Sequence, residues 1–178
     1  YSDYFPPSHS FGLMLKPMEK LTLAFDLTFM EWSKCEQGMK ITSSDEDVFK
    51  SAGLPNLHCE DTWQPRFGAE YIAPAFGLKR TDLIMRLGYS YWDSPWPPME
   101  RGESYIDNNY HLVSGGFSLK RYFNKWVKFA SLDFAIAHFI LEEREHYKRN
   151  LEERLHYPPL TVSEGTVTHT KFGFSVAY

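Results

Sequence analysis

Three carboxylates and one guanidinium, Asp26, Glu70, Arg86 and Asp133, lie on separate predicted strands with the same side-chain parity. Successive side chains of a strand alternate between the two faces of a sheet, so equal parity places these groups on one face. If each short turn is centred on its connection, Asp26 lies opposite Glu70, and Glu70 lies opposite Arg86. On the same basis Arg86 lies opposite Gly116, which lies opposite Asp133. We predict a polar belt in which Arg86 is flanked by Asp26 and Glu70, with stability of the sheet as its simplest role.

The two cysteines, Cys35 and Cys59, fall in one predicted polar loop. A disulfide between them would stabilise the fold by about 3 kcal/mol in the chain-entropy model and would place the chain in an oxidising compartment. Two free thiols are the other main interpretation. His58, Glu60 and Asp61 lie close to Cys59, but their spacing matches no familiar Cys/His zinc pattern, so we predict no metal site.

The sequence contains no catalytic constellation. Neither Ser104 nor Ser114 sits in a G-x-S-x-G elbow, and neither an H-E-x-x-H motif nor a glycine-rich phosphate loop is present. His169 and Ser175 would lie about 20 Å apart along an extended strand, too far to act as a pair. We therefore predict neither an enzyme nor a bound cofactor.

Apolar residues in two predicted loops suggest a different chemistry, the capture of a hydrophobic small molecule. The first loop is the proline-rich segment 93–108, and the second is the cysteine-containing segment 35–61. The alternative is that these residues only pack the loops against each other. The candidate residues are Trp92, Trp96, Tyr105, Ile106, Phe49, Leu54 and Leu57.

Side chains that alternate between large apolar and small or polar types predict the elements that hold these residues. From Asp82 to Trp92, for example, Leu83, Met85 and Leu87 alternate with Asp82, Ile84 and Arg86, which is the period of a strand. The segment Glu142–Glu164 is highly charged and is predicted as a loop, in which a short helix over Glu145–Arg149 is plausible. The predicted strands lie near residues 10–16, 21–34, 62–73, 82–92, 109–122, 126–141 and 165–178.

Strand length and loop asymmetry predict an all-β fold of the transmembrane, antiparallel β-barrel type. Several predicted strands reach the nine to eleven residues that a barrel wall needs, and short turns alternate with long loops, as in bacterial outer-membrane barrels. Aromatic residues gather near both strand ends, as expected at two membrane interfaces. By that pattern the long loops are extracellular and the C-terminus is periplasmic. A soluble sandwich or lipocalin-like barrel is the alternative, since alternation alone does not say which face is inside.

Composition agrees with a barrel and excludes two other classes. Phe, Tyr and Trp make up 17% of the 178 residues, which favours strands. The mean hydropathy is -0.43, and no run approaches 18 uninterrupted apolar residues, which argues against membrane-spanning helices. The net charge of -4 gives no basic footprint for nucleic acid.

The number of predicted strands is odd, whereas bacterial single-chain barrels have even numbers. A seven-stranded sheet with two bare edges in lipid is not viable, because each unpaired backbone group there costs several kcal/mol. Either residues 1–10 contain another strand, or the chain is part of a larger barrel, which we favour.

An ordered set of short motifs resembles the C-terminal half of the FadL-type outer-membrane transporters. The set includes Glu31-Trp32-Ser33, Phe67-Gly68-Ala69-Glu70-Tyr71, Arg86-Leu87-Gly88-Tyr89, Asp93-Ser94-Pro95, Ser114-Gly115-Gly116, Leu132-Asp133 and the terminal Tyr178. The resemblance implies a fourteen-stranded barrel, of which about seven strands are present here, with a plug and a lateral opening in the other half.

The resemblance also implies a function, the passive transport of long-chain fatty acids or other hydrophobic small molecules. The expected partners are such a ligand, outer-membrane lipid and lipopolysaccharide, and the remaining barrel strands and plug. The alternative function is a structural or adhesive barrel whose charged loops bind a partner.

Overall fold

The computed structural model describes residues 6–34, 59–75, 77–96, 108–123, 126–147 and 160–178. Seven strands form one sheet, and a 3-10 turn, η1 (Trp32–Lys34), follows the second strand. No helix among these residues is long and apolar enough to cross a membrane. The strands are β1 (Ser8–Met18), β2 (Leu21–Met30), β3 (Thr62–Pro74), β4 (Thr81–Trp92), β5 (Tyr110–Tyr122), β6 (Phe129–Tyr147) and β7 (Leu160–Ala177).

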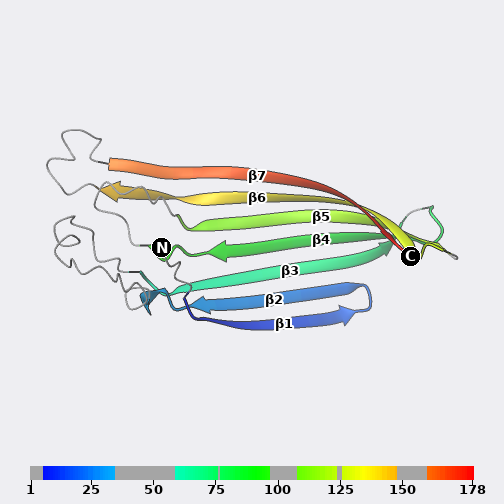
Figure 1. The fold of residues 1–178 in the computed structure, drawn as a ribbon, viewed down its shortest axis with the longest axis horizontal. Helices are drawn as coiled ribbons and strands as arrows, with labels where there is room; N and C mark the ends of the chain where they lie inside the picture. The colour runs from blue at the N-terminus through cyan, green and yellow to red at the C-terminus, as the bar shows by residue number, and fades with distance from the viewer. Residues whose placement is uncertain (1–5, 35–58, 76, 97–107, 124–125, 148–159) are drawn as a thin grey trace, which may run out of the picture.

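Each strand pairs antiparallel with the next in the chain, so the sheet order is β1-β2-β3-β4-β5-β6-β7 (Figure 1). The short connections 19–20, 75–80 and 123–128 lie at one end of the sheet. The longer connections 31–61, 93–109 and 148–159 leave from the opposite end, which we call the loop end. The predicted seven-stranded, all-β meander with alternating connection lengths is therefore confirmed.

The two faces of the sheet differ in chemistry. On one, the apolar face, large side chains stand exposed at alternate positions, for example Leu87 at 71% and Leu132 at 59%. Among the paired residues of β2–β5, Arg121 is the only Asp, Glu, Lys or Arg on this face. The opposite, polar face carries eight of the described strand residues that are less than a tenth exposed. These are Thr28, Thr62, Gln64, Ile84, Ser90, Ser118, Ser131 and Ser163.

The difference in exposure shows how the sheet curves. A curved sheet shields side chains on its concave side and opens those on its convex side. The polar face is thus the concave one, and the apolar face is convex, as in the wall of a barrel with a polar interior.

The predicted end of the second strand was wrong. The strand predicted to run to Lys34 ends at Met30, because Glu31 N bonds back to Pro7 O at 2.9 Å and the 3-10 turn follows. Ser33 N then donates to Asp61 Oδ1 at 2.9 Å. The next strand therefore begins directly opposite, where Thr62 pairs with Met30.

The charged segment after Leu141 was also predicted wrongly. Strand β6 continues to Tyr147 and pairs with β7 from Leu160, after a register shift between Leu141 and Arg144. Residues 145–147 are therefore extended and not helical, and Arg149 lies outside the described residues. We call residues 142–147 and 160–163, which pair from Arg144 and Ser163 onward, the β6–β7 extension.

Candidate functional site

The centre of the polar face carries a hydrogen-bonded belt that crosses three strands. Glu70 on β3 lies directly opposite Arg86 on β4, and Arg86 Nε donates to Glu70 Oε2 at 2.7 Å. Arg86 Nη1 donates to Ser118 Oγ on β5 at 2.8 Å. Ser118 in turn lies opposite Asp133 on β6, whose carboxylate accepts a 3.0 Å bond from Ser131. The Arg86 guanidinium thus joins the Glu70 carboxylate on β3 to the Ser118 hydroxyl on β5.

A second ion pair lies nearer the loop end on the same face. Asp26 on β2 is directly opposite Arg66 on β3, and Arg66 Nη1 lies 3.3 Å from Asp26 Oδ1. Arg66 also donates to Gln64 Oε1 at 3.3 Å. Its guanidinium sits 5.2 Å from the centroid of the Trp92 indole, a cation–π distance.

The predicted register of the polar belt was right in two pairs and wrong in two. Glu70 opposite Arg86 and Arg86 opposite Gly116 are confirmed. Asp26 was expected opposite Glu70 but faces Arg66, because the long connection between β2 and β3 carries no register information. Gly116 faces Ala135 and not Asp133, because β6 begins at Phe129, three residues later than predicted.

Beside the belt, the polar face of β4–β7 is hollowed into a cavity of about 480 Å³, which we call the inner hollow. Its floor is made of small residues that share one register line, Gly88, Ser114 and Ala137. Space is tight within this floor, since a Cβ on Gly88 would lie 2.6 Å from Ser114 Oγ. Charged side chains at the margin are Arg86, Asp133 and Lys171, and His169 lies beside them.

Four rings on the polar face, Trp92, Tyr110, Phe139 and His169, contact one another in sequence and form what we call the aromatic row. Trp92 and Tyr110 stack with 5.6 Å between centroids and 10° between planes. Tyr110 lies 5.9 Å from Phe139, and Phe139 lies 5.6 Å from His169 in an edge-on arrangement. The row ends at the inner hollow, which His169 also lines.

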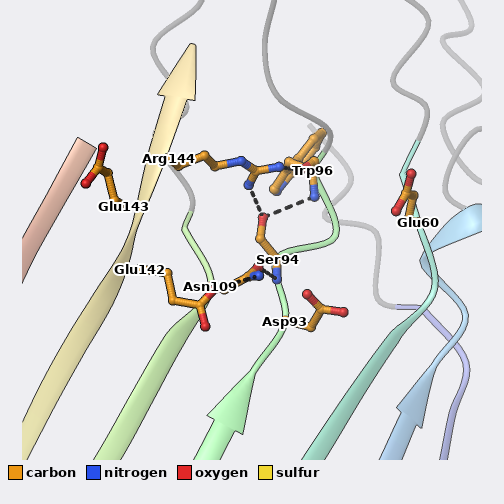
Figure 2. Close-up of a pocket in the computed structure, with 8 residues that line it drawn as sticks. All are labelled: Glu60, Asp93, Ser94, Trp96, Asn109, Glu142, Glu143 and Arg144. Carbon is orange, nitrogen blue, oxygen red and sulfur yellow. Dashed lines mark hydrogen bonds between the residues drawn. The ribbon is translucent and has the colours of Figure 1, made fainter. Parts of the chain in front are cut away.

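A smaller pocket of about 210 Å³ lies at the loop end (Figure 2). Arg144 Nη1 donates to Ser94 Oγ at 3.0 Å, and Arg144 also donates to the carbonyl of Trp96. Ser94 N donates to Asn109 Oδ1 at 2.9 Å, and Asn109 Nδ2 donates to Glu142 Oε2 at 3.1 Å. These bonds brace the start of the β4–β5 connection against β6.

Carboxylates dominate the rest of that pocket, with Glu60, Asp93, Glu142 and Glu143 around it. Burial raises the pKa of Asp93, and the neighbouring charges of Glu142 and Glu60 raise it further. Among the described residues, no group of three or more His, Cys, Asp or Glu side chains could hold a metal ion. The pocket is therefore a brace with an acidic lining.

Next to this brace, Asn108 fastens the β6–β7 extension. Its side chain is 3% exposed, and Nδ2 donates to the carbonyls of Glu142 at 2.8 Å and Ser163 at 2.7 Å. Ser163 Oγ donates to Asn108 Oδ1 at 2.8 Å. The buried Asn108 amide thus gives hydrogen-bond partners to backbone carbonyls of both β6 and β7, at the place where their register shifts.

Only part of the predicted ligand-capture set can be located. Trp92 stands at the end of β4 in the aromatic row, and Trp96 lines the acidic pocket. Cys59 is 7% exposed. Because Cys35 lies outside the described residues, the disulfide and the two free thiols both stay predictions. The other members lie outside the described residues, namely Tyr105, Ile106, Phe49, Leu54, Leu57 and Cys35.

Sequence reasoning missed Arg66, Tyr110 and the aromatic row as a unit. The parity of Phe139 and His169 already placed both rings on the polar side of their strands. The contacts along the whole row were not predictable, because they depend on the register across three strand pairs.

The fold defines the class of the chain, a segment of antiparallel barrel wall with a convex apolar face and a concave polar face. A crystal structure of a Pseudomonas aeruginosa FadL homologue is similar to this chain, with a TM-score of 0.58 and 20% sequence identity. The match covers 96% of this chain and 34% of that one, so the chain spans about a third of the length of its structural neighbour. The part of the implied fold that lies in this chain, a seven-stranded antiparallel segment of barrel wall, is thereby confirmed. No protein-family model and no curated protein matches the sequence.

Proposed function

We propose that this chain forms part of the wall of a bacterial outer-membrane barrel through which hydrophobic small molecules pass by passive diffusion. The observation that carries the proposal is the division of the sheet into a mainly apolar and a mainly polar face. Exposed rows of Leu, Phe, Met and Ile on the convex face would be unstable in water, whereas lipid chains would cover them. The concave face, with its polar belt and inner hollow, then lines the passage.

Aromatic residues near the two ends of the apolar face support the membrane setting. Trp63 and Tyr89 lie toward the loop end, and Tyr71 and Trp126 lie toward the short turns. Girdles of this kind sit at the two interfaces of a membrane barrel. The β6–β7 extension, whose Glu142, Glu143 and Arg144 are charged, rises beyond the loop-side girdle into water. In this orientation the long loops are extracellular and β7 ends on the periplasmic side.

Fatty acids with long chains are the ligand class that we propose for this passage, because the fold likeness is to a FadL homologue. A passive pathway needs neither a cofactor nor a catalytic group. It needs a dry or weakly polar surface along which an amphiphile can exchange water for protein contacts. The small residues of the inner hollow leave room for such a chain, while the belt keeps the strands in register.

Uptake into vesicles tests this function. The protein, purified from the membrane fraction, is reconstituted into vesicles with lipopolysaccharide in the outer leaflet, and the entry rate of labelled hexadecanoate is measured. Ala137→Trp should slow entry, because the indole fills the inner hollow. Ile136→Trp is the matched control on the adjacent apolar position and should leave the rate unchanged. Equal rates for empty vesicles, wild type and Ala137→Trp would refute the proposal.

A further inference from the structure

The aromatic row lies where lipid contact cannot explain it. Large rings on the convex face are expected of a membrane wall, but Trp92, Tyr110 and Phe139 are on the concave, polar face. Their direct register partners on that face are apolar, namely Leu141 for Tyr110, and Leu112 and Val167 for Phe139. The rings are half-buried and each keeps an accessible surface, so they do not form a sealed core. A stack of accessible rings is a surface on which another flat ring can bind.

The row runs diagonally from the loop end into the sheet. Trp92 and Tyr110 are direct register partners at the ends of β4 and β5. Phe139 faces Leu112, two residues deeper along β5 than Tyr110. His169 faces Ala137, two residues deeper along β6 than Phe139. Each step moves one strand sideways and one same-face position away from the loop end, until the row reaches the inner hollow.

The inner hollow carries a lysine without an ion-pair partner among the described residues where the row ends. Its lining includes Arg86 and Lys171 against a single carboxylate, Asp133. Arg86 is already bonded to Glu70 and Ser118. Lys171 is exposed and has no ion-pair partner in the part of the chain that the structure describes. An ammonium group next to a ring surface complements a ligand that combines a ring with an anion.

We propose that the aromatic row and the inner hollow form a binding path for small aromatic carboxylates, with the ring on Phe139 and the carboxylate on Lys171. The inference rests on the proposed function, the passage of hydrophobic small molecules. It adds aromatic carboxylates as a second ligand class beside long-chain fatty acids. A ring would move along the row from Trp92 by successive stacking contacts. Its carboxylate would pair with Lys171 Nζ once it reaches the hollow.

Calorimetric titration of the protein, purified from the membrane fraction in detergent micelles, tests the path with three probes. 2-Naphthoate has both the ring and the carboxylate, 2-naphthylmethanol has the ring alone, and decanoate has the carboxylate alone. Titration into empty micelles corrects for partitioning. Wild type should bind naphthoate more tightly than either of the other probes.

Two variants separate the ring contact from the charge contact. Phe139→Leu should weaken both naphthalene probes about fivefold, the usual worth of an aromatic contact, and leave decanoate unchanged. Phe134→Leu is the matched control, because Phe134 lies on the same strand but on the apolar face, against Phe117 and Phe172. Lys171→Met should weaken naphthoate about tenfold, as for a lost charged hydrogen bond, and leave naphthylmethanol unchanged.

The naphthoate titrations test the binding path, and hexadecanoate entry tests the proposed function. Equal effects of Phe139→Leu and Phe134→Leu, or unchanged naphthoate affinity in Lys171→Met, would overturn the binding path. Hexadecanoate entry into vesicles is measured in parallel. If hexadecanoate enters while the naphthoate results fail, the path is wrong and the proposed function stands. If hexadecanoate does not enter, the proposed function fails whatever the naphthoate results are.

Discussion

Arg86 Nε lies 2.7 Å from Glu70 Oε2 across the β3–β4 register, and the same guanidinium reaches Ser118 on the next strand. The two charges are half and about a third exposed, respectively. Because water screens such a pair, its electrostatic coupling is worth about 0.5–1 kcal/mol. The contact to Ser118, which is 3% exposed, adds a hydrogen bond to a buried hydroxyl.

Exchanging the charges of Arg86 and Glu70 should restore part of the stability that reversing Arg86 alone removes. Arg86→Glu should lower the free energy of unfolding by about 1–2 kcal/mol, since it removes both bonds and places two carboxylates together. Adding Glu70→Arg should recover the pair coupling but not the Ser118 bond. Urea unfolding in lipid vesicles measures both variants. A double variant no more stable than Arg86→Glu alone would show that the pair does not couple.

Two glycines on the polar face, Gly116 and Gly68, should differ in how much an alanine substitution destabilises the protein. A Cβ on Gly116 would lie 2.6 Å from the backbone oxygen of Phe134, so Gly116→Ala forces two strands apart. We expect a loss of about 1–3 kcal/mol, the usual cost of overpacking. A Cβ on Gly68 would meet the Ala24 Cβ at 3.9 Å, an ordinary contact. Gly68→Ala should therefore be nearly neutral in the same unfolding assay, and similar losses for both variants would contradict the register.

Asn108 should control the β6–β7 extension. Asn108→Asp removes the amide donor to the carbonyls of Glu142 and Ser163 and places a carboxylate against them. We expect a loss of about 1–3 kcal/mol, the cost of buried groups left without a partner. Hydrogen exchange should speed up in peptides that cover Glu142–Tyr147, whereas peptides from β2 should not change. Ser163→Ala, which removes one of the three bonds, should have a smaller effect. Unchanged hydrogen exchange in the extension of Asn108→Asp would show that Asn108 does not stabilise it.

The raised pKa of Asp93 predicts a pH dependence at the loop end. A carboxyl whose pKa is higher in the folded state binds its proton more tightly there than in the unfolded state. The contribution of this carboxyl to the free energy of unfolding is therefore complete below the ordinary Asp pKa of 3.8. It is lost as the pH rises through the raised pKa of the folded state. Asp93→Asn, which is never charged, should be more stable than wild type at pH 7, with a gap that narrows toward pH 4.

Glu143→Gln is the control for this titration, since Glu143 is exposed and lines the same pocket. It should leave the thermal midpoint nearly unchanged at both pH values. A gap between Asp93→Asn and wild type that is the same at pH 4 and pH 7 would contradict the argument.

The apolar face of the sheet was predictable from sequence because its signal is periodic. Alternation at Leu83, Met85 and Leu87 fixes both the strand and the face, whatever the neighbouring strand does. The β6–β7 extension was not predictable, because Glu142, Glu143 and Arg144 have the composition of a solvated loop. Beyond the apolar rows of the sheet the strand is charged, and pairing with β7, together with Asn108, holds it extended.

Register limited the prediction of the site. The pair Glu70–Arg86 was found because a short turn joins its strands, whereas Asp26–Arg66 is separated by a long connection whose length sets no register. The aromatic row needed three registers at once. Side-chain types and parity were thus available from sequence, but the contacts that join the four rings into one row were not.

The central claim is that the convex, apolar face meets lipid and the concave, polar face meets water. Covalent labelling of the native protein in vesicles tests it directly, with one photoactivated carbene probe in the lipid tails and hydroxyl radicals in the water. Mass spectrometry then locates the modified residues along β6. The two faces predict carbene labelling at Leu132, Phe134 and Ile136, and radical labelling at Asp133 and Phe139. Carbene labelling at Asp133 and Phe139, or no alternation along the strand, would contradict the account.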